Sequence, residues 1–451
     1  MTYSIIQKSQ LEGAMRIDAE YYQPEYLIIE GKLKTLKAEK LVNLIERPVV
    51  TGSTPKVRDC RCDGTDIKFI KTDTVREGRI IFDTADLLPK EASRNNSKPK
   101  DGDILITIIG ATAAIVGRAA RVFSDDPIMN INQNIVLIRP KKLIRSGYLE
   151  TFFRSKFGRN QLWQQSRQTE QVNLNCREVE NVLVPLANEP FQDKIDKMVS
   201  QSHQIMTESS TIFSQAESLL LEELGLLDFE ADHDLYSVVN IGEVQEADRM
   251  DADYFQAKYK NLTEKLKNAK KLGDITSIQK GVEPGSGAYQ EEGRAFIRVS
   301  NLSKDGIKDN NQQYLSSDLY EKLRSEYQPK IEDILLTKDA TPGIAYVLKE
   351  EIDGIISGGI LRLKMKEKIE PEYLALCINS LVGKLQAERD AGGSIINHWR
   401  PDQIKEILIP ILPKQTQEKI AGLVRKSHES RKKAKDLLEE AKRKVEELIE
   451  K

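Results

Sequence analysis

The sequence predicts an α+β protein made by tandem duplication, in which two mixed α/β domains are separated by two long helices. Two observations predict this fold. The phrase RIDAEYYQPEY at residues 16–26 returns in nearly the same letters as RMDADYFQAKY at residues 249–259. Each half of the chain also ends in a long run with helical periodicity, at residues 188–227 and 413–451. We therefore expect the two long helices to pair as an antiparallel coiled coil, related by a pseudo-twofold axis.

The repeat continues through both halves of the chain. The string GDILIT at residues 102–107 corresponds to EDILLT at residues 332–337. One constant offset relates the following pairs: Tyr148 and Tyr373, Ser155 and Ser380, Gly158 and Gly383, Pro185 and Pro410, His203 and His428. A match over this length indicates a duplicated domain rather than a coincidence.

Within each half, short β-rich runs alternate with turn residues. Examples are IKFI at 67–70 in the first half and AFIRV at 295–299 in the second, with Gly, Pro and Asn in the segments between such runs. This pattern is typical of strands joined by loops. The predicted divisions are a first mixed domain at 1–187, a first long helix at 188–227, a linker with the second mixed domain at 228–412, and a second long helix at 413–451.

The two long helices should share an apolar seam. The first helix should begin at Asn188, because Pro190 then falls in the first turn, where proline is favoured. Small and apolar residues recur along both helices with heptad spacing, as in a coiled coil. The predicted seam is formed by Ile195, Val199, Met206, Phe213, Ala216, Leu220, Ile420, Val424, Ala434, Leu438, Ala441, Val445 and Leu448. The sequence leaves open the alternative that each helix packs separately on the surface of its own core.

Composition limits the class of protein. The chain has 451 residues, too many for one core, and its formal net charge of −2 means that any DNA-binding surface must be locally basic. The longest apolar stretch, at 103–117, is too short to span a bilayer. The first residues lack the pattern of a secretion signal, so we expect a cytoplasmic protein. The four cysteines are not spaced as zinc ligands, so no metal site is expected.

Motifs of known catalytic chemistry are missing from the sequence. The chain has no G-x-x-x-x-G-K-[ST] phosphate loop, no G-x-S-x-G and no H-E-x-x-H string. We therefore expect a binding protein with no catalytic residue. Two alternatives stay open: a DNA-modifying enzyme with an unrecognised motif, and a coiled-coil interaction protein without a role on DNA.

Several strings together resemble one known family. They are TGSTP and KGVEP early in each half, GDILIT and EDILLT, GATAAIVG at 110–117, and GGSIINHWRPDQIKEILIPILPKQTQEKIAGLV at 392–424. The chain is similar, over its whole length, to the specificity subunit of type I restriction-modification systems. Two departures are the missing second proline in VPLANEPFQDKI and GVEP where Gly-x-Thr-Pro is common in the family.

This resemblance implies a function and a set of partners. Each mixed domain would be a target-recognition domain that reads one half-site of an asymmetric, bipartite sequence in double-stranded DNA. The chain would also scaffold two methyltransferase subunits, with restriction (translocase) subunits beyond them. S-adenosylmethionine, ATP and Mg²⁺ would be bound by those partners, and no cofactor by this chain. The paired helices would set the gap between the half-sites.

Base-reading residues are expected in the loops, because loops on a rigid scaffold carry recognition side chains. In the first domain the candidates are Thr51, Ser53, Thr54, Lys56, Arg58, Lys71, Thr72, Asp73, Asn130, Asn132 and Gln133. In the second they are Glu283, Ser286, Tyr289, Arg298, Ser300, Asn301, Lys338, Asp339 and Ser357. Candidates for phosphate or partner contacts are Arg167, Gln168, His398, Trp399 and Arg400. The two sets differ in chemistry, which predicts two different half-sites.

The repeated phrase at 16–26 and 249–259 should not read bases, because two readers of different half-sites would not share it. We expect its Arg, Asp and Tyr side chains to fix each domain to the long helices or to a methyltransferase.

Overall fold

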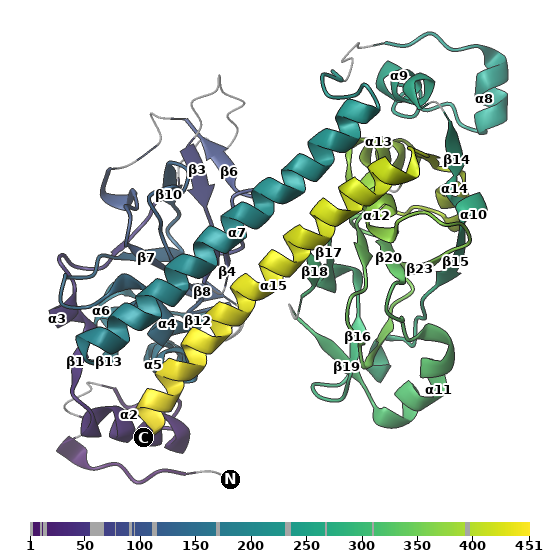
Figure 1. Ribbon diagram of the computed structural model, residues 1–451. Coiled ribbons are helices and arrows are strands. Elements are labelled where there is room, and N and C mark those ends of the chain that lie inside the picture. Colours follow the sequence, from purple (N-terminus) through teal and green to yellow (C-terminus); the bar gives the residue numbers. More distant parts are fainter. Residues whose placement is uncertain are drawn as a thin grey trace. The chain divides into compact units, whose positions relative to one another are not determined.

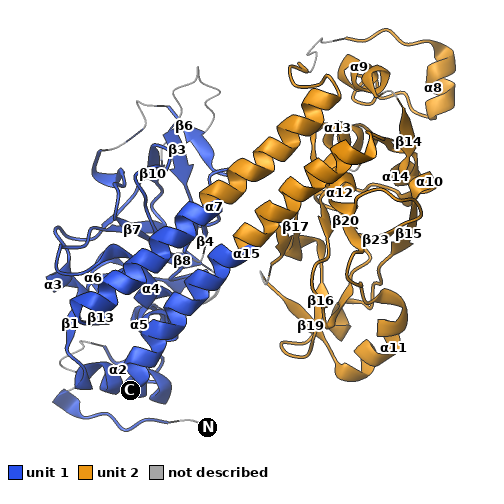
Figure 2. Ribbon diagram, viewed as in Figure 1, with its two compact units in different colours: residues 1–206, 432–451 blue, residues 207–431 orange. Residues whose placement is uncertain are grey.

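The computed structural model describes residues 3–9, 11, 16–54, 67–76, 78–89, 93, 95–110, 115–167, 172–230, 236–266, 268–308, 311–392 and 397–451 (Figure 1). The chain divides into two compact units (Figure 2). Unit 1 comprises residues 1–206 and 432–451, and unit 2 comprises residues 207–431. Within the described ranges, no helix combines the length and the apolar character needed to cross a membrane.

Unit 1 contains two main sheets. A four-stranded antiparallel sheet has the order β2 (Val50–Thr51), β11 (Ile135–Ile138), β7 (Ile104–Thr107), β9 (Ala119–Arg121). A three-stranded sheet has the order β10 (Met129–Ile131), β3 (Ile67–Ile70), β6 (Asp86–Leu88), with β10 parallel to β3. A short pair joins β1 (Ala38–Lys40) to β13 (Leu183–Pro185).

The strand β7 is buried on both faces, which explains its unbroken apolar run. Alternate side chains of a strand point to opposite faces. Ile104 and Ile106 lie in a core with the helices α4 (Ser146–Arg154) and α5 (Lys156–Gln165), whereas Leu105 lies in a second core beside the three-stranded sheet.

The other elements of unit 1 are short. They are α2 (Pro24–Thr35), α3 (Leu41–Leu44), β4 (Val75–Arg76), β5 (Arg79–Ile80), η2 (Asn95–Ser97), β8 (Ile109–Gly110), β12 (Val172–Asn173) and α6 (Cys176–Glu180).

Unit 2 repeats the two main sheets of unit 1 strand for strand. Its four-stranded sheet has the order β15 (Thr276–Lys280), β23 (Ile360–Met365), β20 (Ile334–Thr337), β21 (Ala345–Val347). Its three-stranded sheet has the order β19 (Gln313–Leu315), β16 (Arg294–Ile297), β22 (Gly354–Ile356), again with one parallel pair, β16 and β22. The pair β14 (Ala269–Lys271) and β24 (Leu408–Pro410) corresponds to β1 and β13.

The helices of unit 2 include one insertion. The helices α12 (Pro371–Asn379) and α13 (Leu381–Asp390) correspond to α4 and α5, and α11 (Ser317–Tyr327) lies between β19 and β20. The remaining elements are α8 (Ile241–Ala247), α9 (Ala257–Lys265), α10 (Leu272–Ile275), η3 (Ser286–Ala288), η4 (Val299–Asn301), β17 (Leu302–Ser303), β18 (Gly306–Ile307) and α14 (Pro401–Glu406).

The duplication extends to individual hydrogen bonds. The buried Tyr148 hydroxyl donates to the carbonyl oxygen of Pro185 at 2.8 Å, and the Tyr373 hydroxyl donates to that of Pro410 at the same distance. Both tyrosines therefore tie the first helix of a pair to the last strand of its domain. The predicted duplicated α+β fold is confirmed.

Two long helices run through both units: α7 (Glu189–Glu223) and α15 (Lys414–Glu450), which lie side by side in Figure 1. Within unit 2, Ser209 of α7 lies opposite Ser427, and the later residue Leu220 shares a core with the earlier residue Ile420. The helices therefore run antiparallel.

Unit 1 shows the same arrangement. Ser202 of α7 donates its hydroxyl proton to the carbonyl oxygen of Ala434 at 2.7 Å, and the earlier Ile195 shares a core with the later Val445. The alternative of two helices packed on separate cores is wrong.

Most of the predicted seam is buried. The buried members are Ile195, Val199, Phe213, Ala216, Leu220, Ile420, Val424, Ala434, Leu438, Ala441 and Val445. Met206 and Leu448 are only half-buried. The assignment of Leu448 is corrected to Ile449, which is 3% exposed and belongs to the core of unit 1. An α-helix drifts relative to a strict heptad, so the buried position moves by one residue at the end of α15.

Candidate nucleic-acid interface

In unit 1, three of the predicted loops meet at the ends of β2, β3 and β10. The Ser53 amide donates to the carbonyl oxygen of Ile131 at 3.2 Å, and the Asn132 amide donates to that of Ile70 at 3.0 Å. A Cβ on Gly52 would lie 1.8 Å from the Ile131 oxygen, so only glycine allows this approach. We call the residues gathered here, 51–54, 71, 108–109, 130–134 and 173–174, rim 1.

The same construction recurs in unit 2. The Val282 amide donates to the carbonyl oxygen of Ile356 at 3.1 Å, and the Ser357 amide donates to that of Ile297 at 2.8 Å. A Cβ on Gly281 would lie 2.2 Å from the Ser357 carbonyl oxygen. The glycines of TGSTP and KGVEP therefore serve one purpose, the close packing of two chain segments. We call residues 281–283, 298–300, 338–339, 357–359 and 397–399 rim 2.

Backbone bonds give the residue-by-residue correspondence of the two rims. The Ile108 amide donates to Asn134 in unit 1, and the Lys338 amide donates to Gly359 in unit 2, both at 2.9 Å. The corresponding pairs are Ile108 and Lys338, Ile109 and Asp339, Gln133 and Gly358, Asn134 and Gly359, Asn173 and His398, Leu174 and Trp399. At these positions, rim 1 carries two isoleucines where rim 2 carries Lys338 and Asp339, and it carries Gln133 and Asn134 where rim 2 carries glycines.

An ion network gives rim 2 its charge. Lys338 Nζ lies 2.6 Å from Asp339 Oδ2, and His398 Nδ1 lies 2.8 Å from Asp339 Oδ1. Burial alone would raise the pKa of Asp339, but the hydrogen bonds from Lys338 and His398 outweigh it and lower the pKa. Asp339 is therefore an ionised carboxylate at neutral pH. The His398 ring is 60% exposed, so the network reaches the surface.

Two glycines leave room for the carboxylates of rim 2. A Cβ on Gly358 would lie 2.7 Å from Glu283 Oε1, and one on Gly359 would lie 3.3 Å from Asp339 Oδ2 and 2.8 Å from Val299 Cγ2. Glu283 itself is exposed. The two carboxylates thus pack against the buried backbone of Gly358 and Gly359, where a larger residue would displace them.

Several predicted residues are exposed or half-exposed. In unit 1 these are Thr51, Ser53, Thr54, Lys71, Thr72, Asp73, Gln133 and Arg167, and in unit 2 they are Glu283, Ser286, Tyr289, Arg298, Ser300, Lys338, Asp339, His398 and Arg400. Lys71 Nζ lies 2.9 Å from Asp86 Oδ2, and Arg298 donates to the carbonyl oxygen of Asn311 at 2.6 Å. Ser286 and Tyr289 lie on or next to η3 rather than in rim 2, and the Tyr289 ring lies 5.5 Å from that of Phe296. Lys56, Arg58 and Gln168 lie outside the described residues.

Other predicted residues support the rims from within. Asn130 is 2% exposed, and its side chain accepts a hydrogen bond from Ser97 at 2.6 Å. Asn301 is fully buried and accepts from the Arg298 amide. Asn132 and Ser357 are also buried, and the Asn132 side chain accepts from the Asn134 amide. These groups shape the loops and do not face solvent.

The assignment of Trp399 to a surface contact is corrected. Its side chain is fully buried in the main core of unit 2. The amide of Trp399 is bonded to the carbonyl oxygen of Lys338 at 2.8 Å, which turns the indole inward and leaves its neighbours His398 and Arg400 outside.

The repeated phrase, at residues 16–26 and 249–259, makes the same contacts in both units. In unit 1, Arg16 Nε donates to Asp18 Oδ1 at 2.8 Å, its guanidinium lies 4.7 Å from the centre of the Tyr21 ring, and Nη1 donates to the carbonyl oxygen of Gln165 at 2.7 Å. The hydrogen bond from Arg16 is the main reason that the pKa of Asp18 is lowered.

Unit 2 repeats these contacts. Arg249 donates to Asp251 at 2.7 Å, lies 4.6 Å from the centre of the Tyr254 ring, and donates to the carbonyl oxygen of Arg389 at 3.3 Å. Both arginines thus reach the carboxyl end of α5 or α13, where a cation is favoured. The expected attachment of these arginines to the long helices is corrected, because they fix the phrase to a shorter helix of their own unit.

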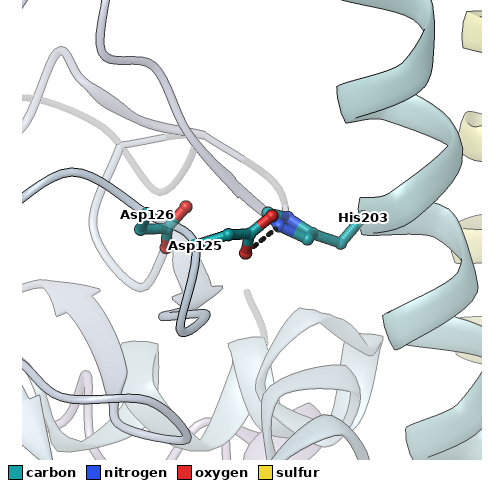
Figure 3. Close-up of side chains that lie close together, drawn as sticks. All are labelled: Asp125, Asp126 and His203. Carbon is teal, nitrogen blue, oxygen red and sulfur yellow. Dashed lines mark hydrogen bonds and ion pairs between the residues drawn. The ribbon is translucent and has the colours of Figure 1, made fainter.

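One cluster in unit 1 offers groups that could hold a cation, although no metal site was expected. Asp125, Asp126 and His203 bring one ligand atom each within 4.8 Å of one another (Figure 3). His203 Nε2 lies 2.8 Å from Asp125 Oδ1, and Asp126 accepts from the Phe123 amide at 2.8 Å. Burial raises the pKa of Asp126. Hydrogen bonds within the chain therefore account for the cluster.

One segment of the chain matches a known domain family. The family of type I restriction modification DNA specificity domains matches residues 264–437. The specificity subunit of the Escherichia coli type I restriction enzyme EcoBI is 26% identical over 188 residues, which is 40% of this chain and 36% of that protein. The match thus covers about a third of the curated relative's length.

Two solved structures are similar over most of their length. The type I restriction-modification S subunit from M. genitalium has 14% identity, covers 91% of this chain and 94% of that chain, and has a TM-score of 0.39. The HsdS subunit from Thermoanaerobacter tengcongensis has 15% identity, covers 92% and 95%, and has a TM-score of 0.28. The similarity to type I restriction modification DNA specificity domains therefore lies in residues 264–437.

Proposed function

We propose that this chain is the DNA sequence-recognition subunit of a type I restriction-modification complex, and that each unit reads one half-site of an asymmetric, bipartite target. The observation that carries the proposal is the correspondence between the rims. Ile109 and Asp339 hold the same backbone position, as do the exposed Asn173 and His398, yet the side chains at these positions differ in chemistry. A shared scaffold with different exposed chemistry is what two readers of different sequences need.

The chemistry of each rim indicates which bases it suits. Carboxylates accept a hydrogen bond from the N4 amino group of cytosine, so Glu283 and Asp339 favour a half-site containing a C·G pair. In rim 1, the exposed Gln133 suits adenine, to which a glutamine amide can form two hydrogen bonds. The serine and threonine hydroxyls at residues 51–54 and the lysine at 71 would contact phosphates or bases in either case.

The chain's partners would carry the chemistry. In the proposed complex it scaffolds two methyltransferase subunits that use S-adenosylmethionine, and restriction subunits that use ATP and Mg²⁺. The chain itself would bind none of these cofactors and would catalyse no step.

Modified-base mapping tests the recognition role. DNA from cells that carry this chain and its methyltransferase should be methylated at one split sequence. Replacing residues 1–185 by those of a relative with another target should change one half of that sequence only. A change in both halves, or in neither, would contradict the assignment of one half-site to each unit.

A second experiment tests the absence of catalysis. The purified chain, incubated alone with DNA, Mg²⁺ and labelled S-adenosylmethionine, should neither cut nor label the DNA. Turnover by the chain alone would make it an enzyme and refute the proposal.

A further inference from the structure

A short segment ahead of the repeated phrase is itself repeated. Residues 3–6 read Tyr-Ser-Ile-Ile and residues 236–239 read Tyr-Ser-Val-Val, and each lies at the same distance ahead of the arginine of the phrase, Arg16 or Arg249. The duplicated chain has therefore kept two aromatic-aliphatic segments with nearly the same side chains.

In unit 1 this segment is apolar and exposed. The exposed fraction is 81% for Tyr3, 88% for Ile5 and 89% for Ile17. Ser4 Oγ donates to the carbonyl oxygen of Tyr22 at 2.5 Å, so the segment is held against the repeated phrase. We call residues 3–6 together with Ile17 strip 1.

Unit 2 presents the same exposed groups. The exposed fraction is 80% for Tyr236, 91% for Val238 and 87% for Met250. The helix α8 follows directly, and none of its residues is buried, although its ends are well defined by a capping box at Asn240 and a left-handed residue at Asp248. We call residues 236–241 together with Met250 strip 2.

A helix of this length that buries nothing has little stability of its own. Isolated helices shorter than about 12 residues are marginal in water, and helices in proteins are stabilised by packing an apolar face. The exposed Ile241 and the half-exposed Val244, one turn later, give α8 such a face. The face and the strip together form an apolar surface of the kind that marks a protein–protein contact.

The repetition indicates what covers the strips. The rims differ between the units, as two half-sites require, whereas the strips are alike, so their occupant is the same for both units and is present twice. DNA does not fit strip 2, because Glu243, Glu246 and Asp248 beside it would repel phosphates, and an occupant shared by both strips is then not DNA. The occupant is a protein with an apolar groove that takes the strip. A basic side chain beside that groove would complement the acidic residues next to strip 2.

We propose that each strip docks one copy of the methyltransferase subunit, so that strip 1 and strip 2 are equivalent attachment points for two identical partners. This inference rests on the scaffolding role proposed above. It assigns that role to an extended segment and to Ile17 or Met250, on surfaces separate from the rims that would read DNA.

Counting the bound partners tests the proposal. The full-length chain and its own methyltransferase are purified together, and the mass of the complex is measured by sedimentation velocity. Ile5→Ser with Ile17→Ser should leave one methyltransferase per chain, as should Val238→Ser with Met250→Ser, and all four substitutions should leave none. Each double variant should weaken its site by about tenfold or more, since buried apolar anchors dominate such contacts.

Matched controls keep the result specific. Ile128→Ser in unit 1 and Ile331→Ser in unit 2 also remove exposed apolar side chains, 73% and 46% exposed, and should leave two methyltransferases bound. Because the substituted residues are exposed, thermal unfolding of every variant should match that of the unchanged chain.

The contrary outcomes are distinct. If the four-residue variant still binds two methyltransferases, the strips are not the attachment points, while the recognition proposal stands. If the unchanged chain binds no methyltransferase, both proposals fail. If the chain alone forms a dimer that the substitutions dissociate, the occupant is a second copy of the chain and the proposal is overturned.

Discussion

The hydroxyl oxygens of Ser209 and Ser427 lie 3.0 Å apart in the buried seam of unit 2. Ser209 Oγ also donates to the carbonyl oxygen of Ser427 at 2.8 Å, and Ser427 Oγ to that of Ser209 at 2.9 Å. Two small polar side chains thus bond to the backbone of the facing helix, where larger residues would force the helices apart. This pair fixes the register of α7 against α15.

The serine pair predicts a graded loss of stability. Ser209→Ala removes one buried hydrogen bond and should lower the free energy of unfolding of unit 2 by about 1 kcal/mol. Ser209→Leu should cost about 1–3 kcal/mol, because the added atoms overfill the seam. Thermal unfolding measures both, with the exposed Ser214→Ala as the control. Equal effects of Ala and Leu would mean that the helices are not closely packed at this point.

The rim glycines predict an effect confined to one half-site. Gly281→Ala places a Cβ 2.2 Å from a backbone oxygen, so rim 2 must open and should lose its half-site preference. Gly52→Ala should do the same to rim 1. Binding is measured on DNA altered in one half-site at a time. Gly287→Ala, whose Cβ would meet no atom within 4 Å, should leave both preferences unchanged.

The Glu283 carboxylate predicts a change of specificity. Glu283→Gln keeps the shape of the side chain but adds an amide donor, so the preference for cytosine at one position should weaken by about 1–3 kcal/mol. A binding selection with randomised half-sites reports the change. Glu291→Gln, another exposed carboxylate of unit 2, should select the unchanged target. If both variants select the same sequences as the unchanged chain, Glu283 does not read a base.

The Asp339 network predicts a pH-dependent stability difference. The pKa of Asp339 is lower in the folded chain than in the unfolded one, so its ion pair with Lys338 and its hydrogen bond with His398 stabilise the fold above about pH 4 and cease to do so as the pH falls through the folded pKa. Asp339→Asn should therefore be less stable than the unchanged chain at pH 7, by about 1 kcal/mol or more. The difference should shrink toward pH 3 in thermal unfolding. If the stability difference between the two chains stays constant with pH, it comes from the shape of the side chain and not from its charge.

Much of the architecture could be predicted because the sequence of the first half is repeated in the second half. The matched pair Tyr148 and Tyr373 falls on the same hydrogen bond in each unit, and the heptad spacing of Ile195, Val199 and Ala216 correctly predicts their burial. Periodicity identifies buried faces well, because burial repeats with the helix turn. Periodicity is less precise at helix ends. At the end of α15 it predicted that Leu448 is buried, whereas the buried residue is Ile449.

The rims could be predicted only in part. Loop composition pointed to Glu283 and Asp339, but not to the pairing of Asp339 with His398, which lie far apart in the sequence and meet through backbone bonds between loops. Composition also could not separate exposed amides from buried ones, so Asn130 and Asn301 were predicted alongside Gln133. A long-range contact decides each of these cases, and no local pattern encodes it.

The core of unit 1 has a consequence for how the chain folds during synthesis. Ala441, Val445 and Ile449 belong to the same core as Ile104 and Tyr148, although the ribosome adds them some three hundred residues later. Domains generally fold in the order in which they emerge. Here the first half must wait with an open apolar face until α15 is released, so a chain that stalls after unit 2 would expose that face to chaperones and proteases. The core of the first domain is thus completed only after the last helix has been synthesised.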